Sequence, residues 1–156
     1  MKTIHGMEEL AAAQGEEIGV TEWQELTQDQ IDVFSDATGD HYWIHVDPER
    51  AKEGPLGSTV AHGLYTLSLG PAANYALIAF EGFGVQMNYG YEKVRFPAPV
   101  PVGSRLRMRL QIGKVQASGV GTRVVLRQTF ECEGSDKPAC VAEMLLYLAV
   151  EPSASR

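Results

Sequence analysis

The sequence lacks the features of a membrane-spanning, exported or nucleic-acid-binding chain. No stretch reaches the ~18 uninterrupted apolar residues of a membrane span, and the N-terminus has no apolar signal core. The 13 Lys and Arg against 20 Asp and Glu give a net charge of −7, which leaves no basic excess for nucleic acid or an anionic membrane surface. These absences predict a soluble, cytoplasmic protein whose partners include neither nucleic acid nor a membrane.

Cysteine is scarce, with only Cys132 and Cys140 in the chain. They flank an expected turn at residues 134–138 and could face each other across a hairpin. Because the other features are cytosolic, two reduced and partly buried thiols are the favoured interpretation. No metal site is predicted.

Length and hydrophobic content are those of one folded domain. The chain has 156 residues, of which 44% are hydrophobic, enough for a buried core in a domain of ordinary size. It has no repeats and no low-complexity tracts. We expect a single domain over residues 1–151, followed by a short polar tail at residues 152–156.

The first half of the chain carries helix signals. Residues 7–14 are rich in helix formers. Thr27 begins a capping-box pattern, and the helix that follows it is expected to end at Gly39. Another helix start lies at residues 47–48, where an Asp N-cap precedes a Pro. Residues 59–80 form the longest apolar segment and predict one long, buried and kinked helix.

After residue 83 the hydrophobic pattern changes from helical to alternating. It predicts strands at residues 84–90, 91–96, 105–115, 122–133 and 139–150. Half-buried alternation of this kind is typical of an antiparallel sheet with one packed face and one solvated face. The fold class is therefore α+β, and a long central helix wrapped by a curved antiparallel sheet is the hot-dog arrangement.

Asp40 and His45 are the most informative pair in the chain. They lie five residues apart, between one helix end and the next helix start. A carboxylate and an imidazole are the minimum set of side chains for moving protons to and from a bound water. The spacing alone is weak, since Asp40 could cap a turn and His45 could satisfy a buried polar loop. The neighbouring segment 61–64, with sequence AHGL, strengthens the functional interpretation.

Three ordered motifs resemble the signature of the MaoC-like, (R)-specific enoyl-CoA hydratases. The first, at residues 34–48, contains a Gly-Asp pair with a His five positions after the Asp. The second and third are residues 60–64 and 94–100. The resemblance covers nearly the whole chain and is closest to the single-domain, NodN-like branch. In place of the family's usual Asn-Pro between the paired residues, this chain has Tyr42-Trp43. Two bulky aromatic side chains there could narrow or reshape the acyl pocket. They would then affect the preferred length of the acyl chain more than the reaction.

The resemblance implies reversible hydration of a trans-2-enoyl-CoA to an (R)-3-hydroxyacyl-CoA by a homodimer. CoA is part of the substrate, and no cofactor is implied. Asp40 is the expected base, and His45 orients the water and shares proton transfer. Gly63 is the expected oxyanion donor, because backbone N–H groups in the first helical turn lack intrahelical partners. Gly63 could equally be a packing glycine.

The expected substrate-binding residues are Phe96, Asn88 and Tyr91, although a strand aromatic can also be an ordinary core residue. His62 and Ser68 lie near the site but are interpreted as structural. Five arginines could meet the phosphates of CoA, but a solvated sheet face balanced by glutamates is favoured: Arg105, Arg107, Arg109, Arg123 and Arg127.

Two other functions stay open. A thioesterase on the same fold usually places a carboxylate on the central helix, and residues 59–80 contain no Asp or Glu. A non-catalytic acyl-CoA-binding module would not need both Asp40 and His45. The fold itself does not decide between these functions.

Overall fold

The computed structural model describes residues 1–149. The predicted domain boundary at residue 151 and the tail at 152–156 lie outside this range. The helices are α1 (Gly6–Ala12), α2 (Gln28–Thr38), α3 (Trp43–Val46), α4 (Pro48–Lys52), α5 (Gly63–Ser68) and α6 (Gly70–Leu77). The strands are β1 (Lys2–His5), β2 (Glu17–Val20), β3 (Gln24–Glu25), β4 (Ile78–Glu81), β5 (Val85–Arg95), β6 (Arg105–Ser118), β7 (Gly121–Cys132) and β8 (Cys140–Ala149).

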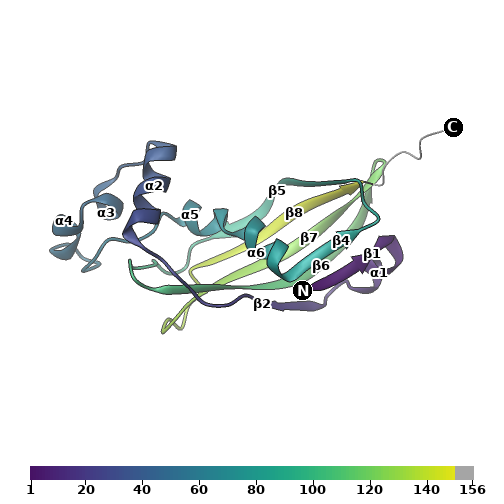
Figure 1. The fold of residues 1–156 in the computed structure, drawn as a ribbon, viewed down its shortest axis with the longest axis horizontal. Helices are drawn as coiled ribbons and strands as arrows, with labels where there is room; N and C mark the ends of the chain where they lie inside the picture. The colour runs from purple at the N-terminus through teal and green to yellow at the C-terminus, as the bar shows by residue number, and fades with distance from the viewer. Residues whose placement is uncertain (150–156) are drawn as a thin grey trace.

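The main sheet is antiparallel, as the alternation predicts. Its strand order is β2-β6-β7-β8-β5, and the short β3 also pairs with β6. Along β6 the buried residues are Leu106, Met108, Leu110 and Ile112, while the residues between them are more exposed. Figure 1 shows α5 and α6 lying across the face that these buried side chains occupy.

The two strands predicted at residues 84–90 and 91–96 are a single strand, β5. It pairs with β8 along its length, with register shifts between Asn88 and Gly90 and again between Tyr91 and Lys93. A bulge adds a residue to one strand without ending the ladder, so the Gly-containing interruption does not break the strand in two.

The prediction of one helix over residues 59–80 is wrong. Residues 59–62 are extended, and Val60 forms an isolated bridge with Pro101. The helical part is divided at Leu69, where Pro71 in the first turn of α6 has no N–H to continue the α5 ladder. The segment ends as β4, which pairs in parallel with β1. That long-range pairing places residues 78–80, which were predicted as helix, in a strand.

The small helices gather at one end of the molecule. Figure 1 shows α2, α3 and α4 beyond the ends of the long strands, at the N-terminal end of α5. β1 and α1 lie at the opposite end of the molecule (Figure 1). None of the helices in residues 1–149 has the length and apolar character needed to cross a membrane. The end that carries α2–α4 also carries the segment between residues 39 and 47.

Cys132 and Cys140 are free, buried thiols. They lie on paired strands but not opposite each other, since Cys140 pairs with Phe130 in the β7–β8 ladder. Burial raises the pKa of the Cys140 thiol to about 11. Their burial agrees with the favoured interpretation, and their reduced state stays a prediction.

Candidate functional site

Asp40 follows a helix whose two ends are set by local sequence. Thr27 and Gln30 form the predicted capping box at the start of α2. Gly39 ends the helix in the left-handed conformation, with φ 77°, which glycine adopts without steric cost. Asp40 therefore leaves the helix in a fixed direction. Its side chain is 57% exposed, so the carboxylate lies at the surface of the site.

His45 is held inside the short helix α3 and is only 8% exposed. Its Nδ1 lies 2.7 Å from the carbonyl oxygen of Val60. A carbonyl can only accept, so Nδ1–H donates, and in the neutral ring Nε2 is left with a free lone pair. A 3.0 Å hydrogen bond from Val60 N–H to the backbone oxygen of Ile44 also joins the segment at residues 59–62 to α3.

The structure brings Asp40, His45 and His62 into one cluster. Each offers a ligand atom within 4.8 Å of the others. The set resembles a metal site in composition, but the rings of His45 and His62 stack with centroids 3.7 Å apart and planes at 24°. Lone pairs in nearly parallel ring planes do not converge on one ion. The arrangement suits proton transfer better than metal ligation.

His62 is a member of the cluster that the sequence analysis interpreted as structural and left out of the catalytic set. It is 3% exposed, and its Nε2 lies 2.9 Å from the backbone oxygen of Asp40. Its Nδ1 is buried and has no hydrogen-bond partner among residues 1–149. The one signal in the sequence was its position directly before Gly63, because a residue at a helix start can reach back toward the preceding loop.

Gly63 is the first residue of α5, directly after the cluster. Its place in the first helical turn is as predicted, although that helix starts four residues later than expected. Phe96 lies against its Cα: a Cβ on Gly63 would be 2.8 Å from Cγ of the Phe96 ring. Two of the predicted site residues are therefore in direct contact, and only glycine leaves room for this contact.

Asn88 and Tyr91 do not join the cluster through any hydrogen bond or aromatic contact in residues 1–149. The Asn88 side chain accepts from Gly90 N–H at 3.1 Å, which stabilises the bulge in β5. Tyr91 is partly buried and packs against the hydrophobic core. Burial raises the pKa of the Tyr91 hydroxyl, and a hydrogen bond with Asn88 opposes that rise. Their predicted role in substrate binding stays a prediction.

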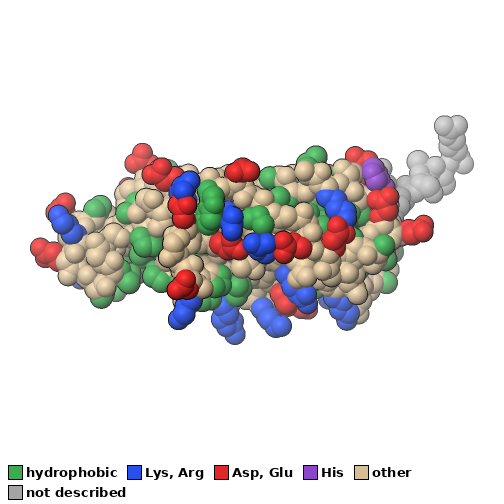
Figure 2. Space-filling view, turned by 90° about the horizontal axis from the view of Figure 1, so that it is seen from below, with side chains coloured by type: hydrophobic (Ala, Val, Ile, Leu, Met, Phe, Trp, Pro, Cys, Tyr) green, Lys and Arg blue, Asp and Glu red, His purple; other side chains and the backbone are tan. Residues whose placement is uncertain are grey.

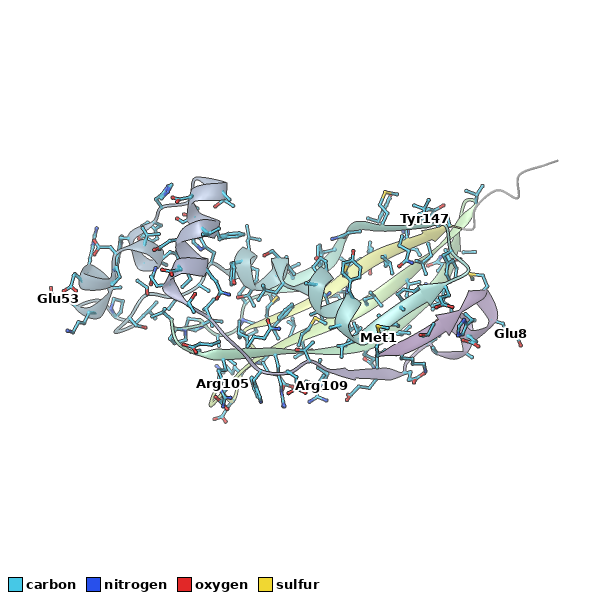
Figure 3. All side chains as sticks on the ribbon, viewed as in Figure 1. Met1, Glu8, Glu53, Arg105, Arg109 and Tyr147 are labelled. Carbon is cyan, nitrogen blue, oxygen red and sulfur yellow. The ribbon has the colours of Figure 1, made fainter. Side chains whose placement is uncertain are left out.

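The arginines of β6 form ion pairs with glutamates on the face of the sheet that points away from α5 and α6 (Figure 3). Arg105 binds Glu133, and Arg107 and Arg109 both bind Glu131. Arg105 and Arg109 project from β6 away from α5 and α6 (Figure 3). Figure 2 shows basic and acidic side chains interspersed over the face seen from below. This arrangement fits the favoured interpretation of a solvated, charge-balanced face.

A cavity of about 420 Å³, lined by both apolar and polar side chains, lies between α5–α6, β6 and the β2–β3 segment. Its walls include Tyr65, Leu69, Ala73 and Met108, but not the three clustered side chains. Tyr65 packs edge-on against Phe34, with ring centroids 5.5 Å apart. Phe34 in turn contacts His62, with centroids 5.0 Å apart. One aromatic layer therefore separates the cavity from the cluster.

Relatives by sequence cover almost all of the chain. The family model described as "MaoC like domain" matches residues 9–131. The chain is 50% identical over 151 residues to 3-hydroxyacyl-thioester dehydratase Z of Mycobacterium tuberculosis, covering 96% of this chain and 100% of that protein. It is 40% identical over 142 residues to Nodulation protein N of Rhizobium leguminosarum bv. viciae, covering 89% and 88% of the two.

Solved structures share the fold. The unliganded (R)-hydratase of Pseudomonas aeruginosa has a TM-score of 0.68 at 20% identity, over 88% of this chain and 83% of that chain. An (R)-hydratase from A. caviae has a TM-score of 0.68 at 17% identity, over 88% and 96% of the two chains. These likenesses confirm the predicted hot-dog fold.

Proposed function

The chain belongs to the MaoC-like dehydratase family and is an enzyme of the hydratase–dehydratase type, and from this premise we propose its substrate and its catalytic residues. The substrate is a trans-2-enoyl-CoA, which the enzyme hydrates reversibly to an (R)-3-hydroxyacyl-CoA in fatty-acid or polyhydroxyalkanoate-type metabolism. CoA enters as part of the substrate, and the reaction needs no resident cofactor. The observation that carries the proposal is the convergence of Asp40 and His45 beside the first turn of α5.

Asp40 and His45 together hold one water in this proposal. Asp40 takes a proton from the water as the water oxygen bonds to C3 of the substrate. His45 contacts the same water through Nε2, because Nδ1–H is committed to Val60 O. The pair then returns a proton to C2, so water is added across the double bond. Such a pair contributes about 10²–10⁴-fold to a rate.

Gly63 N–H is the proposed donor to the thioester oxygen, on which negative charge develops during attack at C3. Donors in the first turn of a helix lack intrahelical acceptors and point outward from the helix end. One such donor is worth roughly 3–4 kcal/mol in the transition state. Phe96, packed on Gly63, is proposed to border the thioester, with Asn88 and Tyr91 further along β5.

A thioesterase is the less favoured function. The helices that would carry its carboxylate, α5 and α6, contain no Asp or Glu. A non-catalytic acyl-CoA-binding module is disfavoured because it gives no reason for a buried His45 with a free Nε2 beside an exposed carboxylate.

The acyl chain is proposed to occupy the cavity behind the Phe34–Tyr65 pair. The apolar part of its lining, which includes Leu69, Ala73 and Met108, suits a hydrocarbon, and the Tyr65–Phe34 pair lies between the cavity and His62. Ala73 lines the cavity where α6 faces β6, so a larger side chain at that position would shorten the available space.

A cytoplasmic homodimer is the proposed form of the protein. β5 is an edge strand that pairs only with β8 in the described residues. Three large apolar side chains on it are exposed: Val85, Met87 and Tyr89. Unpaired backbone groups beside exposed apolar side chains favour pairing with a second chain. The two buried thiols are consistent with a reducing compartment.

Loss of enoyl-thioester absorbance on incubation with crotonyl-CoA and longer trans-2-enoyl-CoAs tests the reaction. Asp40→Asn and His45→Gln should each lower turnover by about 10²–10⁴-fold while circular dichroism stays unchanged. Chiral analysis of the product tests the (R) assignment. Absence of turnover at every chain length would remove the enzyme assignment, and full activity in either variant would remove that residue from the mechanism.

A further inference from the structure

His62 precedes α5 at the N-cap position, but its side chain makes no capping hydrogen bond there. The ring points instead toward the loop after α2. Its Nε2 lies 2.9 Å from the backbone oxygen of Asp40 and 3.9 Å from Oδ2 of the same residue. Because a carbonyl oxygen only accepts, Nε2 carries the proton and donates it to that oxygen.

The backbone oxygen of Asp40 has two donors. Ser35 Oγ–H, from the last turn of α2, donates to it as well as His62. Within residues 1–149, the Asp40 carboxylate accepts one long hydrogen bond, from Tyr42 N–H at 3.4 Å, besides its 3.9 Å contact with His62 Nε2. The direction of this exposed carboxylate is therefore set through its backbone. His62 is the only one of the two donors that belongs to the α5 side of the site.

His62 also covers one face of the His45 ring, at a centroid distance of 3.7 Å. The edge of that ring is held by the bond from Nδ1–H to Val60 O. Together these contacts fix both the plane of the His45 ring and its rotation within the plane. Phe34 packs against His62 in turn, so His62 has little freedom to move.

We propose that His62 is a positioning residue for the hydration reaction: its hydrogen bond to the backbone oxygen of Asp40 fixes the distance between Asp40 and the His45 ring beside it. The inference rests on the proposed function of that pair. His62 and Ser35 thus hold the start of the loop that contains Tyr42-Trp43, through the backbone oxygen of Asp40. The unpartnered, buried Nδ1 follows from committing Nε2 to Asp40.

Two substitutions separate the hydrogen bond from packing. His62→Gln keeps an N–H donor at nearly the same reach and loses the ring. His62→Phe keeps an aromatic ring beside Phe34 and His45 and loses the donor. A misplaced catalytic group can cost about 10²-fold, so we expect His62→Phe to lower kcat by roughly that factor with KM little changed. His62→Gln should lose less than about tenfold.

The matched control is His5→Phe. His5 is an exposed residue of β1 that pairs with Glu81, in a different sheet from the site. It should keep wild-type kcat and KM. If His62 serves only packing, His62→Phe will be as active as His62→Gln or more so, and that order overturns the proposal.

A double-mutant cycle shows whether His62 acts through Asp40. In an Asp40→Asn background, His62→Phe should have little further effect on the residual rate, whereas independent sites give additive losses. Hydrogen exchange of amides 40–45 provides a measurement that needs no turnover. Exchange should be faster in His62→Phe than in His62→Gln or wild type, and equal exchange in all three refutes the positioning role even if the protein proves not to hydrate enoyl-CoA.

Discussion

Replacing Gly63 by Ala tests the contact that joins two of the proposed site residues. A Cβ at this position would meet Cγ and both Cδ atoms of Phe96 at 2.8–3.0 Å. These atoms are at the base of the ring, so a rotation of the ring about its own axis does not relieve the overlap. Either Phe96 or the first turn of α5 must move.

The expected cost follows from overpacking. Inserting a methyl group into a filled space costs about 1–3 kcal/mol when neighbours must shift. At this chain length each kcal/mol lowers the melting temperature by roughly 2–4 °C. Turnover should fall as well, because the Gly63 N–H is aimed by the turn that has to move, and loss of one oxyanion donor costs about 10²–10³-fold.

Thermal unfolding and the crotonyl-CoA absorbance assay measure the two effects separately. Gly63→Ala combined with Phe96→Ala should recover most of the lost stability, because the ring that opposes the new methyl group is gone. The two substitutions should therefore be strongly non-additive. Wild-type stability and turnover in Gly63→Ala would refute the close contact, and additive losses in the double variant would show that Phe96 does not pack on Gly63.

Three further predictions follow from the structure. Burial opposes ionisation of Glu131, but hydrogen bonds from Arg107 and Arg109 outweigh it and lower its pKa below 4.5. The ionised Glu131 therefore stabilises the fold above pH 4.5, and this contribution is lost as the pH falls through the lower pKa of the folded state. Glu131→Gln should therefore make stability fall less steeply below pH 4.5, as measured in acid titrations followed by circular dichroism. Ala73→Phe should lower activity on long enoyl-CoAs more than on crotonyl-CoA, and an equal effect on both would place the acyl chain outside the cavity. Met87→Glu, on the exposed edge of β5, should shift the protein toward monomer in light scattering, while an unchanged dimer would exclude that edge as the interface.

The dyad loop illustrates how far local sequence carries. The capping box at Thr27, the left-handed Gly39 and the Asp47 cap were all predicted, and all are present. Each depends on hydrogen bonds or backbone preferences within a few residues. The position of Asp40 directly after the end of α2 could therefore be predicted without knowledge of the rest of the molecule.

The segment 59–80 shows where that reasoning fails. Its apolar content favoured one helix, but the apolar side chains at residues 78–80 are equally suited to a strand once β1 lies beside them. The bulges of β5 are similar, because β8 supplies the ladder that joins the two predicted pieces. Hydrophobic periodicity predicts which residues are buried, but it does not predict which element packs against them.

The sequence by itself determined the α+β class, the antiparallel strands, the helix ends around the loop and the candidacy of Asp40, His45 and Gly63, because each depends on neighbouring residues. Only the tertiary structure decided that His62 contacts both Asp40 and His45. That hydrogen bond spans 22 residues of sequence, and it depends on the extended segment at residues 59–62 crossing beside α3. Side chains separated by that distance along the chain meet only through the packing of α2, α3 and α5.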